Sequence, residues 1–413
     1  PLEHDSSPGS LCPDMMTAPF DTVPRTRLVF GNGTLTRLGE LARELGGTRV
    51  LLVTDRGIVS AGHADRAREA LEKAGLGVVL YDAVRENPTT GDVARCLAVA
   101  REGRVDLIVG LGGGSSMDTA KGTNFLLTNG GEMRDYWGVG KATRPMLPLI
   151  AVPTTAGTGS ECQSAALIAD EGTHQKMACL DPKAAARVAV LDPELTVSQP
   201  VRVTAVTGID AIAHAVETAV TTKRNAVSLM YSLEAFKRLV RAFPRVLAQP
   251  SDLEARGEML LGAAFAGTAI ENSMLGAAHA CANPLTAHFD LVHGAAVGLM
   301  LPHVIRFNAA GDDVTRRAYA ELASAPELAC VSEGLDQAVD ALVARLESLL
   351  NLAGIPRSLA EAGADPAQIA QLSAEAARQW TANFNPRKLT LDDFHGLYQA
   401  ATTPRGEGDA DAG

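Results

Sequence analysis

The chain has 413 residues, which is long for a single hydrophobic core and makes two domains the expected arrangement. Its 46% hydrophobic and 21% charged residues are those of an ordinary soluble globular protein, and no apolar run reaches the roughly 18 residues of a membrane-spanning helix. The formal net charge of -11 disfavours binding to nucleic acids and to anionic membrane surfaces.

The two ends of the chain and the cysteines indicate its compartment. Residues 1–23 are polar and rich in turn formers, without the apolar segment of a secretory signal, so we expect a disordered leader there and a disordered acidic tail at 405–413. The cysteines form no C-x-x-C pair, which argues against a disulfide framework or a thiolate zinc site. A reducing cytoplasm fits this pattern best.

The first part of the chain alternates short apolar runs with amphipathic helical stretches. After an edge strand or hairpin at 26–30, strands are predicted at 49–55, 78–81, 105–111, 148–153 and 187–192. Helices are predicted at 61–74 and near 91–102. Continuous apolar strands between helices indicate a parallel sheet covered on both faces, so we expect an α/β dinucleotide-binding domain over residues 24–198.

Asp55 ends the predicted strand 49–55. From such a position a carboxylate can take both hydroxyls of an adenosine ribose and repel a 2′-phosphate, which favours NAD over NADP. The alternatives are a turn aspartate without a ligand, and a 2′-phosphate accepted by the neighbouring Arg56.

A glycine-rich turn follows the strand 105–111. The sequence G-G-G-S-S-M-D-T-A-K-G (112–122) should open a helix, where glycines allow close approach of a ligand and exposed N–H groups attract phosphate oxygens. Asp118 and Lys121 add charge, and we count Asp118 among the candidate cofactor-binding residues. The spacing is not the G-x-G-x-x-G of a Rossmann fingerprint, and a plain turn without a ligand is the alternative.

A second polar loop, P-T-T-A-G-T-G-S-E (153–161), follows the strand 148–153. Its hydroxyls and glycines suit phosphate or ribose contacts at the carboxyl ends of parallel strands. Strand signals nearly vanish after residue 198, and Ala- and Leu-rich helical patterns follow at 203–221, 226–246, 251–270, 295–308, 333–353 and 366–381. We therefore expect an all-helical domain over residues 199–404.

Histidines gather in the apolar stretch 267–308, which holds His279, His288, His293 and His303. Because an unpaired imidazole is costly to bury, something polar should be held there. Fourteen residues of unbroken helix would separate His279 from His293 by about 21 Å, but Pro284 is expected to interrupt the stretch and let the chain fold back.

Upstream, His214 follows Asp210 by four residues, which places both side chains on one helix face. With His279 and His293 they would form a nitrogen and oxygen set for a divalent metal. A helix-terminal aspartate beside an unrelated core histidine is the alternative for the first pair. His288 and His303 are more typical of structural or pocket-lining histidines.

The motifs follow one another along the chain as G-G-G-S-S-M-D-T-A-K, P-T-T-A-G-T-G-S-E, D-A-I-A-H, H-A-C-A-N-P with a later H-G, and N-P-R (385–387). In this order they resemble the iron-containing (group III) alcohol dehydrogenase family, over roughly residues 24–402. The resemblance implies an α/β nucleotide domain, an all-helical metal domain, and a metal held by Asp210, His214, His279 and His293. Iron(II) is the usual ion, and zinc(II) is the alternative. It also implies nucleotide contacts from Asp55, Gly113, Gly114, Ser115, Thr154, Thr155 and Lys176.

One position departs from the family pattern. Many members read H-x-x-x-H-P where this chain has Asn283 before Pro284, so a histidine often linked to proton transfer beside the nicotinamide is replaced. Because asparagine does not titrate, proton exchange would use water, the nicotinamide ribose hydroxyls or His288. Asn283 and His288 are therefore the candidate catalytic residues.

The resemblance predicts a metal-dependent, NAD(H)-linked alcohol dehydrogenase or aldehyde reductase for a small alcohol or aldehyde, forming a homodimer or higher homo-oligomer. The metal would act as a Lewis acid on the substrate oxygen while hydride passes between carbon and nicotinamide. The pocket positions that the family suggests are small or apolar and specify no charged substrate group (Ala165, Ile270, Leu275 and Thr381).

Two kinds of alternative remain. On the same fold, the chain could be a three-ligand polyol dehydrogenase, a metal-free maleylacetate reductase or a dehydroquinate-synthase-like lyase, although retention of all four ligand positions argues against the metal-free branch. Outside enzymes, it could be a nucleotide- or metal-binding protein without turnover, which only Asn283 favours.

Overall fold

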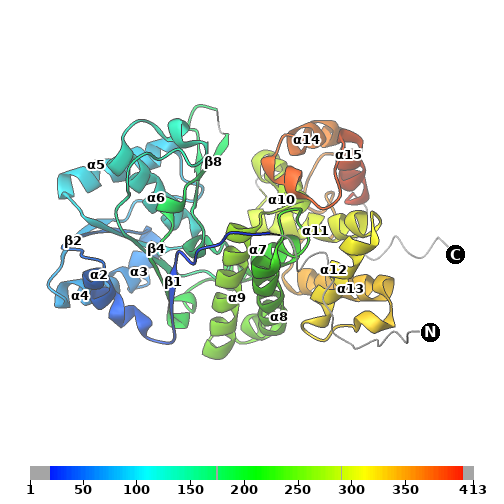
Figure 1. Ribbon diagram of the computed structural model, residues 1–413, viewed down its shortest axis with the longest axis horizontal. Coiled ribbons are helices and arrows are strands. Elements are labelled where there is room, and N and C mark those ends of the chain that lie inside the picture. Colours follow the sequence, from blue (N-terminus) through cyan, green and yellow to red (C-terminus); the bar gives the residue numbers. More distant parts are fainter. Residues whose placement is uncertain (1–18, 174, 290, 403–413) are drawn as a thin grey trace. The chain divides into compact units, whose positions relative to one another are not determined.

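The computed structural model describes residues 19–173, 175–289 and 291–402 (Figure 1). All of the predicted tail (405–413) and most of the predicted leader (1–23) lie outside the described residues. The chain divides into two compact units. The α/β unit comprises Val23–Thr204 and Gln249–Gly267, and the helical unit comprises the described residues up to Thr22, Ala205–Ala248 and the described residues from Thr268 onward.

A six-stranded parallel sheet forms the centre of the α/β unit. Its strands lie in the order β1-β9-β6-β4-β2-β3, and each neighbouring pair is parallel. They are β1 (Arg27–Phe30), β2 (Arg49–Val53), β3 (Gly77–Tyr81), β4 (Leu107–Gly112), β6 (Leu149–Pro153) and β9 (Val188–Leu191). The predicted parallel sheet is confirmed.

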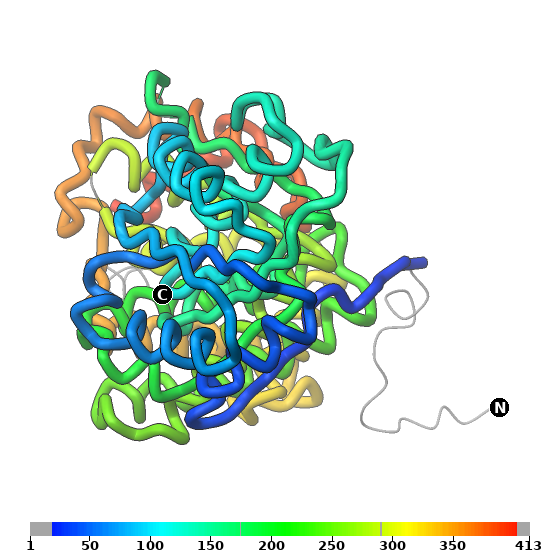
Figure 2. The backbone as a smooth tube through the Cα atoms, turned by 90° about the vertical axis from the view of Figure 1, so that its left-hand side faces the viewer, coloured from blue at the N-terminus to red at the C-terminus, as the bar shows by residue number. Residues whose placement is uncertain are grey.

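Helices cover both faces of this sheet. They are α2 (Leu38–Glu44), α3 (Arg56–Ser60), α4 (His63–Lys73), α5 (Thr90–Gly103) and α6 (Gly114–Asn129). Val50 and Leu52 of β2 share a core with α2 and α4, whereas Leu51 and Val53 share one with α5 and α6, and Figures 1 and 2 show these helix pairs on opposite faces. Because both faces are buried, the strands read as continuous apolar runs.

The sequence did not predict a second, three-stranded sheet in the same unit. Its order is β5-β8-β7, with β7 and β8 antiparallel. The strands are β5 (Gly138–Val139), β7 (Ala165–Ala169) and β8 (Lys176–Leu180). Ile168 pairs with Met177 and both are buried, but the strands are short, and β7 (AALIA) is rich in alanine, a poor strand former, so their signal is weak.

The second half of the chain is helical, as predicted. Its helices are α7 (Val201–Thr218), α8 (Ala226–Ala248), α9 (Leu253–Asn272), α10 (Ala277–Phe289), α11 (His293–Ala309), α12 (Asp313–Ser324), α13 (Leu335–Leu352), α14 (Ile369–Ala376) and α15 (Leu391–Ala400). The sequence did not predict α10, α12 and α15 as helices. Within the described ranges, no helix is both long enough and apolar enough to cross a membrane.

Most of α9 belongs to the α/β unit, although it follows the predicted boundary at residue 198. Its Leu260 and Ala264 share a core with Leu191 of β9. At Gly267, an added Cβ would lie 2.3 Å from the carbonyl oxygen of Gly159, so the two backbones pack directly. A helical sequence pattern shows that one face is apolar, but it does not say which core that face covers.

Candidate metal centre and nucleotide site

One face of α7 carries three polar side chains in the helical unit. Asp210, His214 and Glu217 are spaced by four and three residues, so they project from the same side of the helix. All three are buried, at 5%, 5% and 3% exposure, among apolar neighbours of the same helix. Such groups need polar partners, because burying them unpaired is costly.

Two further helices bring histidines to this face. The Nε2 atoms of His214, His279 and His293 lie 3.6, 3.5 and 3.8 Å from Oδ1 of Asp210. The His279 ring stacks on His214, with 4.8 Å between centroids, and its centroid lies 5.4 Å from that of His293. Three imidazoles therefore surround one carboxylate oxygen, and all four sequence-predicted metal ligands lie together.

The chain reverses between α10 and α11, after Pro284 and not at it. α10 continues through Pro284 to Phe289, and α11 begins at His293. The prediction that Pro284 interrupts this stretch was wrong. A proline inside a helix costs one hydrogen bond and about 3 kcal/mol, but α10 buries Ala280, Cys281 and Leu285, and this packing outweighs the cost.

Gly294 allows α11 to approach α7 closely. A Cβ at this position would lie 2.0 Å from the carbonyl oxygen of Val206, one turn before Asp210 on α7. Any side chain would force the first turn of α11 away from α7, and His293 starts that turn. The absence of a side chain at Gly294 thus allows α11 to lie close enough to α7 for the imidazole of His293 to reach the cluster.

The cluster has the charge and the unpaired atoms of a cation site. Asp210 Oδ1 and His279 Nε2 are buried without a hydrogen-bond partner among the described residues. Burial alone would raise the pKa of the Asp210 carboxyl, but the three imidazoles hold it well below its usual value. Burial likewise lowers the pKa of His279, but the carboxylates of Glu217 and Asp210 outweigh it and raise that pKa to about 9. One carboxylate and three imidazoles fit a divalent cation.

The two candidate catalytic residues lie on different faces of α10. Asn283 follows His279 by one turn, and its Nδ2 donates to Gln379 Oε1 at 3.0 Å. His288 follows His279 by nine residues, which is about half a turn out of phase in a helix of 3.6 residues per turn. Its Nε2 pairs with Glu375 Oε2 of α14 at 2.8 Å, so the structure does not bring His288 to the metal cluster.

In the α/β unit, the glycine-rich turn joins β4 to α6 as predicted. Gly112 ends β4 with φ of +145, and a Cβ there would lie 2.4 Å from Ser116 Oγ. A Cβ at Gly114 would lie 2.8 Å from Thr158 Cγ2, whereas at Gly113 it would make only ordinary contacts with Thr155. Gly112 and Gly114 are therefore required by the fold, and Gly113 is the position where the missing side chain leaves room.

Other predicted nucleotide residues lie around this turn. Asp55 caps α3, with Oδ1 accepting from the Ile58 N–H at 3.0 Å, and its Oδ2 lies beside Gly112. Thr154 is buried, and its N–H donates to the Gly112 carbonyl at 3.0 Å. These residues lie at the carboxyl ends of β2, β4 and β6, where α/β sheets bind ligands.

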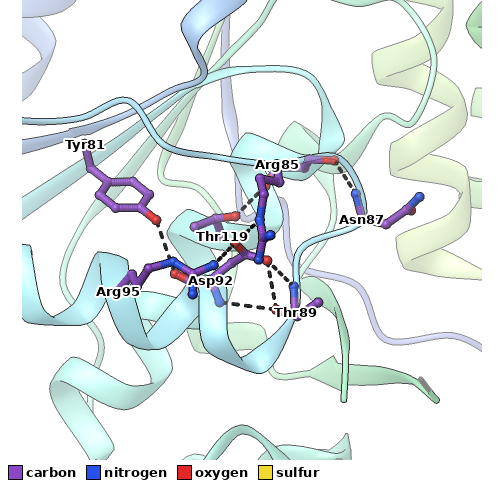
Figure 3. A network of polar contacts seen from close by, with 8 residues as sticks. Tyr81, Arg85, Asn87, Thr89, Asp92, Arg95 and Thr119 are labelled. Atoms are coloured by element: carbon purple, nitrogen blue, oxygen red, sulfur yellow. Dashed lines mark hydrogen bonds and ion pairs between the residues drawn. The ribbon is translucent and has the colours of Figure 1, made fainter. Parts of the chain in front are cut away.

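The loop after β3 is tied to the same turn. The backbone N–H of Asn87 donates to Ser115 Oγ at 3.3 Å. Buried Asp92 accepts from Arg85, at 2.7 Å, and from Arg95 and Thr89, which fixes this loop on α5 (Figure 3). Burial opposes ionisation of Asp92, but these hydrogen bonds outweigh it and lower its pKa to about 2.

Asp118 and the two lysines differ in exposure. Desolvation raises the pKa of Asp118 to about 6, although Lys121 and Lys176 oppose the shift. Lys176 is exposed at the start of β8. Lys121, in contrast, is buried, and its Nζ donates to the Ser160 carbonyl and Oγ and to the carbonyls of Gln163 and Ala165, at 2.6 to 3.0 Å. It holds the 153–161 loop on α6.

Comparisons with known proteins match both halves of the chain. The model for "Iron-containing alcohol dehydrogenase" matches residues 24–193, and that for "Fe-containing alcohol dehydrogenase family, C-terminal" matches residues 204–402. Alcohol dehydrogenase 4 of Schizosaccharomyces pombe is 34% identical over 374 residues, 90% of this chain and 87% of the relative. The NAD-dependent methanol dehydrogenase of Bacillus methanolicus is 33% identical over 368 residues, 89% of this chain and 95% of the relative.

Solved structures agree with these matches. An alcohol dehydrogenase from Oenococcus oeni is similar with a TM-score of 0.89 and 31% identity, covering 93% of this chain and 100% of that one. Sequence and structure thus match the same family along nearly the whole chain. The chain belongs to the iron-containing alcohol dehydrogenase family.

Proposed function

We propose that Asp210, His214, His279 and His293 hold the divalent cation of an NAD(H)-linked alcohol dehydrogenase or aldehyde reductase. The observation that carries this proposal is the arrangement of three imidazoles around Asp210 Oδ1, at 3.5 to 3.8 Å. The buried atoms Asp210 Oδ1 and His279 Nε2, which lack hydrogen-bond partners in the described part of the chain, support it. A cation would satisfy both at once.

Iron(II) is the proposed ion, because the family to which the chain belongs is named for iron. The donor set does not distinguish it from zinc(II), which generally binds nitrogen and oxygen ligands more tightly than iron(II) does. Zinc therefore remains the alternative, and metal analysis of the isolated protein separates the two.

The nucleotide is proposed to bind at the carboxyl ends of the central strands. Backbone N–H groups at the start of α6 would take the pyrophosphate, with Gly113 leaving room for it. Asp55 would take the adenosine ribose, which favours NAD over NADP. The relative from Bacillus methanolicus is named as NAD-dependent, which supports this choice.

The reaction is the interconversion of a small alcohol and its aldehyde or ketone. When bound, NAD(H) exchanges hydride with the substrate carbon, and the cation polarises the substrate oxygen as a Lewis acid. Asn283 does not titrate and His288 is paired with Glu375. We therefore assign the proton transfer to water or to the nicotinamide ribose hydroxyls, and not to Asn283.

A spectrophotometric assay of NADH oxidation with a panel of small aldehydes tests the proposal. We expect turnover with one or more uncharged aldehydes, in the iron- or zinc-loaded protein, and lower efficiency with NADPH. Equal efficiency with both nucleotides would contradict the role of Asp55. Tight binding of NADH and metal without turnover on any aldehyde would favour a binding protein that has lost catalysis.

Location and assembly stay predictions of the sequence. The scattered cysteines predict a cytoplasmic protein, and the resemblance predicts a homodimer or higher homo-oligomer. Light scattering of the purified protein checks the second prediction, since a mass of 43.1 kDa would show a monomer.

A further inference from the structure

We infer that Glu217 is a positioning residue that holds His279 in the orientation needed for metal binding. This inference rests on the proposed metal centre. Glu217 lies two turns after Asp210 on α7, on the same helix face. It therefore stands behind His279, on the far side of the ring from the cluster.

Both oxygens of the Glu217 carboxylate are in use. Oε2 pairs with Nδ1 of His279 at 2.5 Å, and Oε1 accepts from the backbone N–H of Ala278 at 2.7 Å. The side chain is 3% exposed, so water does not compete for these contacts. One carboxylate thus fixes the ring of His279 and the backbone that carries it.

The opposite edge of the ring faces the other ligands. With Nδ1–H donating to Glu217, Nε2 faces Asp210 Oδ1, 3.5 Å away, and is the ring atom that would bind a cation. The ring face stacks on His214 with an interplanar angle of 18°. α7 therefore supplies two of the proposed ligands and orients a third, and a carboxylate on Nδ1 also makes the imidazole a better metal donor.

The start of α10 is built around this contact. Asn385 Oδ1 accepts from the Ala277 N–H at 3.3 Å, so Asn385 and Glu217 together satisfy successive N–H groups of the first turn of α10. Gly276 leaves room for both, because a Cβ there would lie 3.1 Å from Glu217 Oε1 and from Asn385 Oδ1. Glu217 could therefore serve stability alone, and the test must separate stability from metal binding.

The sharpest variant is Glu217→Gln, which keeps the shape of the side chain. A glutamine has one acceptor oxygen, so it can serve the Ala278 N–H or the His279 Nδ1–H but not both. Glu375→Gln is the matched control, since Glu375 pairs with His288 of the same helix, away from the cluster. Metal-free forms of both variants and of the unmodified protein are titrated with Co²⁺ against a competing chelator, and their thermal unfolding is recorded.

We expect Co²⁺ to bind Glu217→Gln about 10- to 100-fold more weakly than the unmodified protein, with a changed visible spectrum. Glu375→Gln should keep the affinity and the spectrum of the unmodified protein. Unchanged Co²⁺ affinity and spectrum in Glu217→Gln would overturn the positioning role, even if this variant unfolds at a lower temperature.

Failure of the unmodified protein to bind Co²⁺ would instead contradict the proposed metal centre itself. If Glu217→Gln does not fold, Glu217→Asp takes its place, because it keeps the charge but is one methylene too short to reach both donors. The same weakening of Co²⁺ binding is expected, and unchanged binding in the folded Asp variant would overturn the inference.

Discussion

The metal cluster and the nucleotide turn are assembled in opposite ways. The cluster uses side chains from α7 and from α10 and α11, which lie about 60 to 80 residues later in the sequence, and all of them are buried except the partly exposed His293. The turn is one short segment after β4 that offers mainly backbone groups. Truncation of a ligand side chain should therefore abolish metal binding at the cluster. Nucleotide binding at the turn should instead be lost only when a side chain is added.

Glycine serves both regions, for different partners. Gly294 lets two helices touch so that His293 reaches Asp210, and Gly114 makes room for Thr158 of the neighbouring loop. Both are packing glycines inside the protein. Gly113 differs, because nothing in the described structure crowds its missing side chain, and this open position is what a ligand-binding loop requires.

The largest effect is expected from His279→Ala. Loss of this ligand should release the metal and lower turnover by about three powers of ten or more, since the Lewis acid contributes several kcal/mol to catalysis. NAD binding should persist, because its residues lie in the other unit. Metal analysis, kinetics and NAD titration check this, with His395→Ala on α15 as the control. Normal turnover in metal-free His279→Ala would contradict the claim that the reaction depends on the metal cluster.

Gly294→Ala should damage the cluster without touching any ligand. The added methyl group would overlap the Val206 carbonyl, and such overpacking typically costs about 1 to 3 kcal/mol. We expect a lower free energy of unfolding and weaker metal binding, measured by denaturant titration and metal analysis. Gly396→Ala on α15, a helical glycine where nothing lies within 4 Å of the added Cβ, is the matched control. Unchanged metal affinity in Gly294→Ala would mean that α11 has another way to reach α7.

Gly113→Val should weaken NAD binding by about tenfold or more, a loss of about 1.4 kcal/mol. The side chain would occupy the space proposed for the pyrophosphate, while metal content stays near normal. Fluorescence titration with NADH checks this. Gly114→Val is less informative, because it would also strike Thr158 and disturb the fold. Unchanged NADH affinity in folded Gly113→Val would show that this segment is only a structural turn and does not bind the nucleotide.

The smallest effect on function is expected from Asp92→Asn, which removes the anchor of the loop after β3. The folded-state pKa of about 2 lies below the ordinary 3.8, so ionised Asp92 contributes stability above about pH 4. That contribution is lost as the pH falls through 2. The variant should be about 1 to 2 kcal/mol less stable at pH 7 and should approach the unmodified protein in strong acid. Denaturant unfolding of both proteins across the pH range checks this. An equal difference in their free energies of unfolding at every pH would contradict the link between ionisation of Asp92 and stability.

The sequence predicts the main sheet well and its surroundings less well. Strands buried on both faces, such as β4, read as apolar runs and were located closely. The short strands β7, which is rich in alanine, and β8 give no comparable signal. α10 was missed because Pro284 suggested a break, whereas the burial that carries the helix through the proline is a property of the folded unit.

The candidate metal ligands were accessible to sequence reasoning because histidine is rare and its four-residue spacing from Asp210 is visible. Glu217 was missed, since a helical glutamate usually faces solvent and only the structure shows it buried against His279. Its three-residue spacing from His214 was the available signal. In the sequence, Lys121 supports a ligand loop, but in the structure its ammonium donates to groups inside the protein.

Anomalous diffraction from crystals of the iron- or zinc-loaded protein tests the metal centre most directly. We predict one strong peak at the absorption edge of the metal, about 2.0 to 2.2 Å from Asp210 and from the Nε2 atoms of His214, His279 and His293. A peak at any other group of side chains, or no peak in crystals of fully active protein, would contradict the proposed centre.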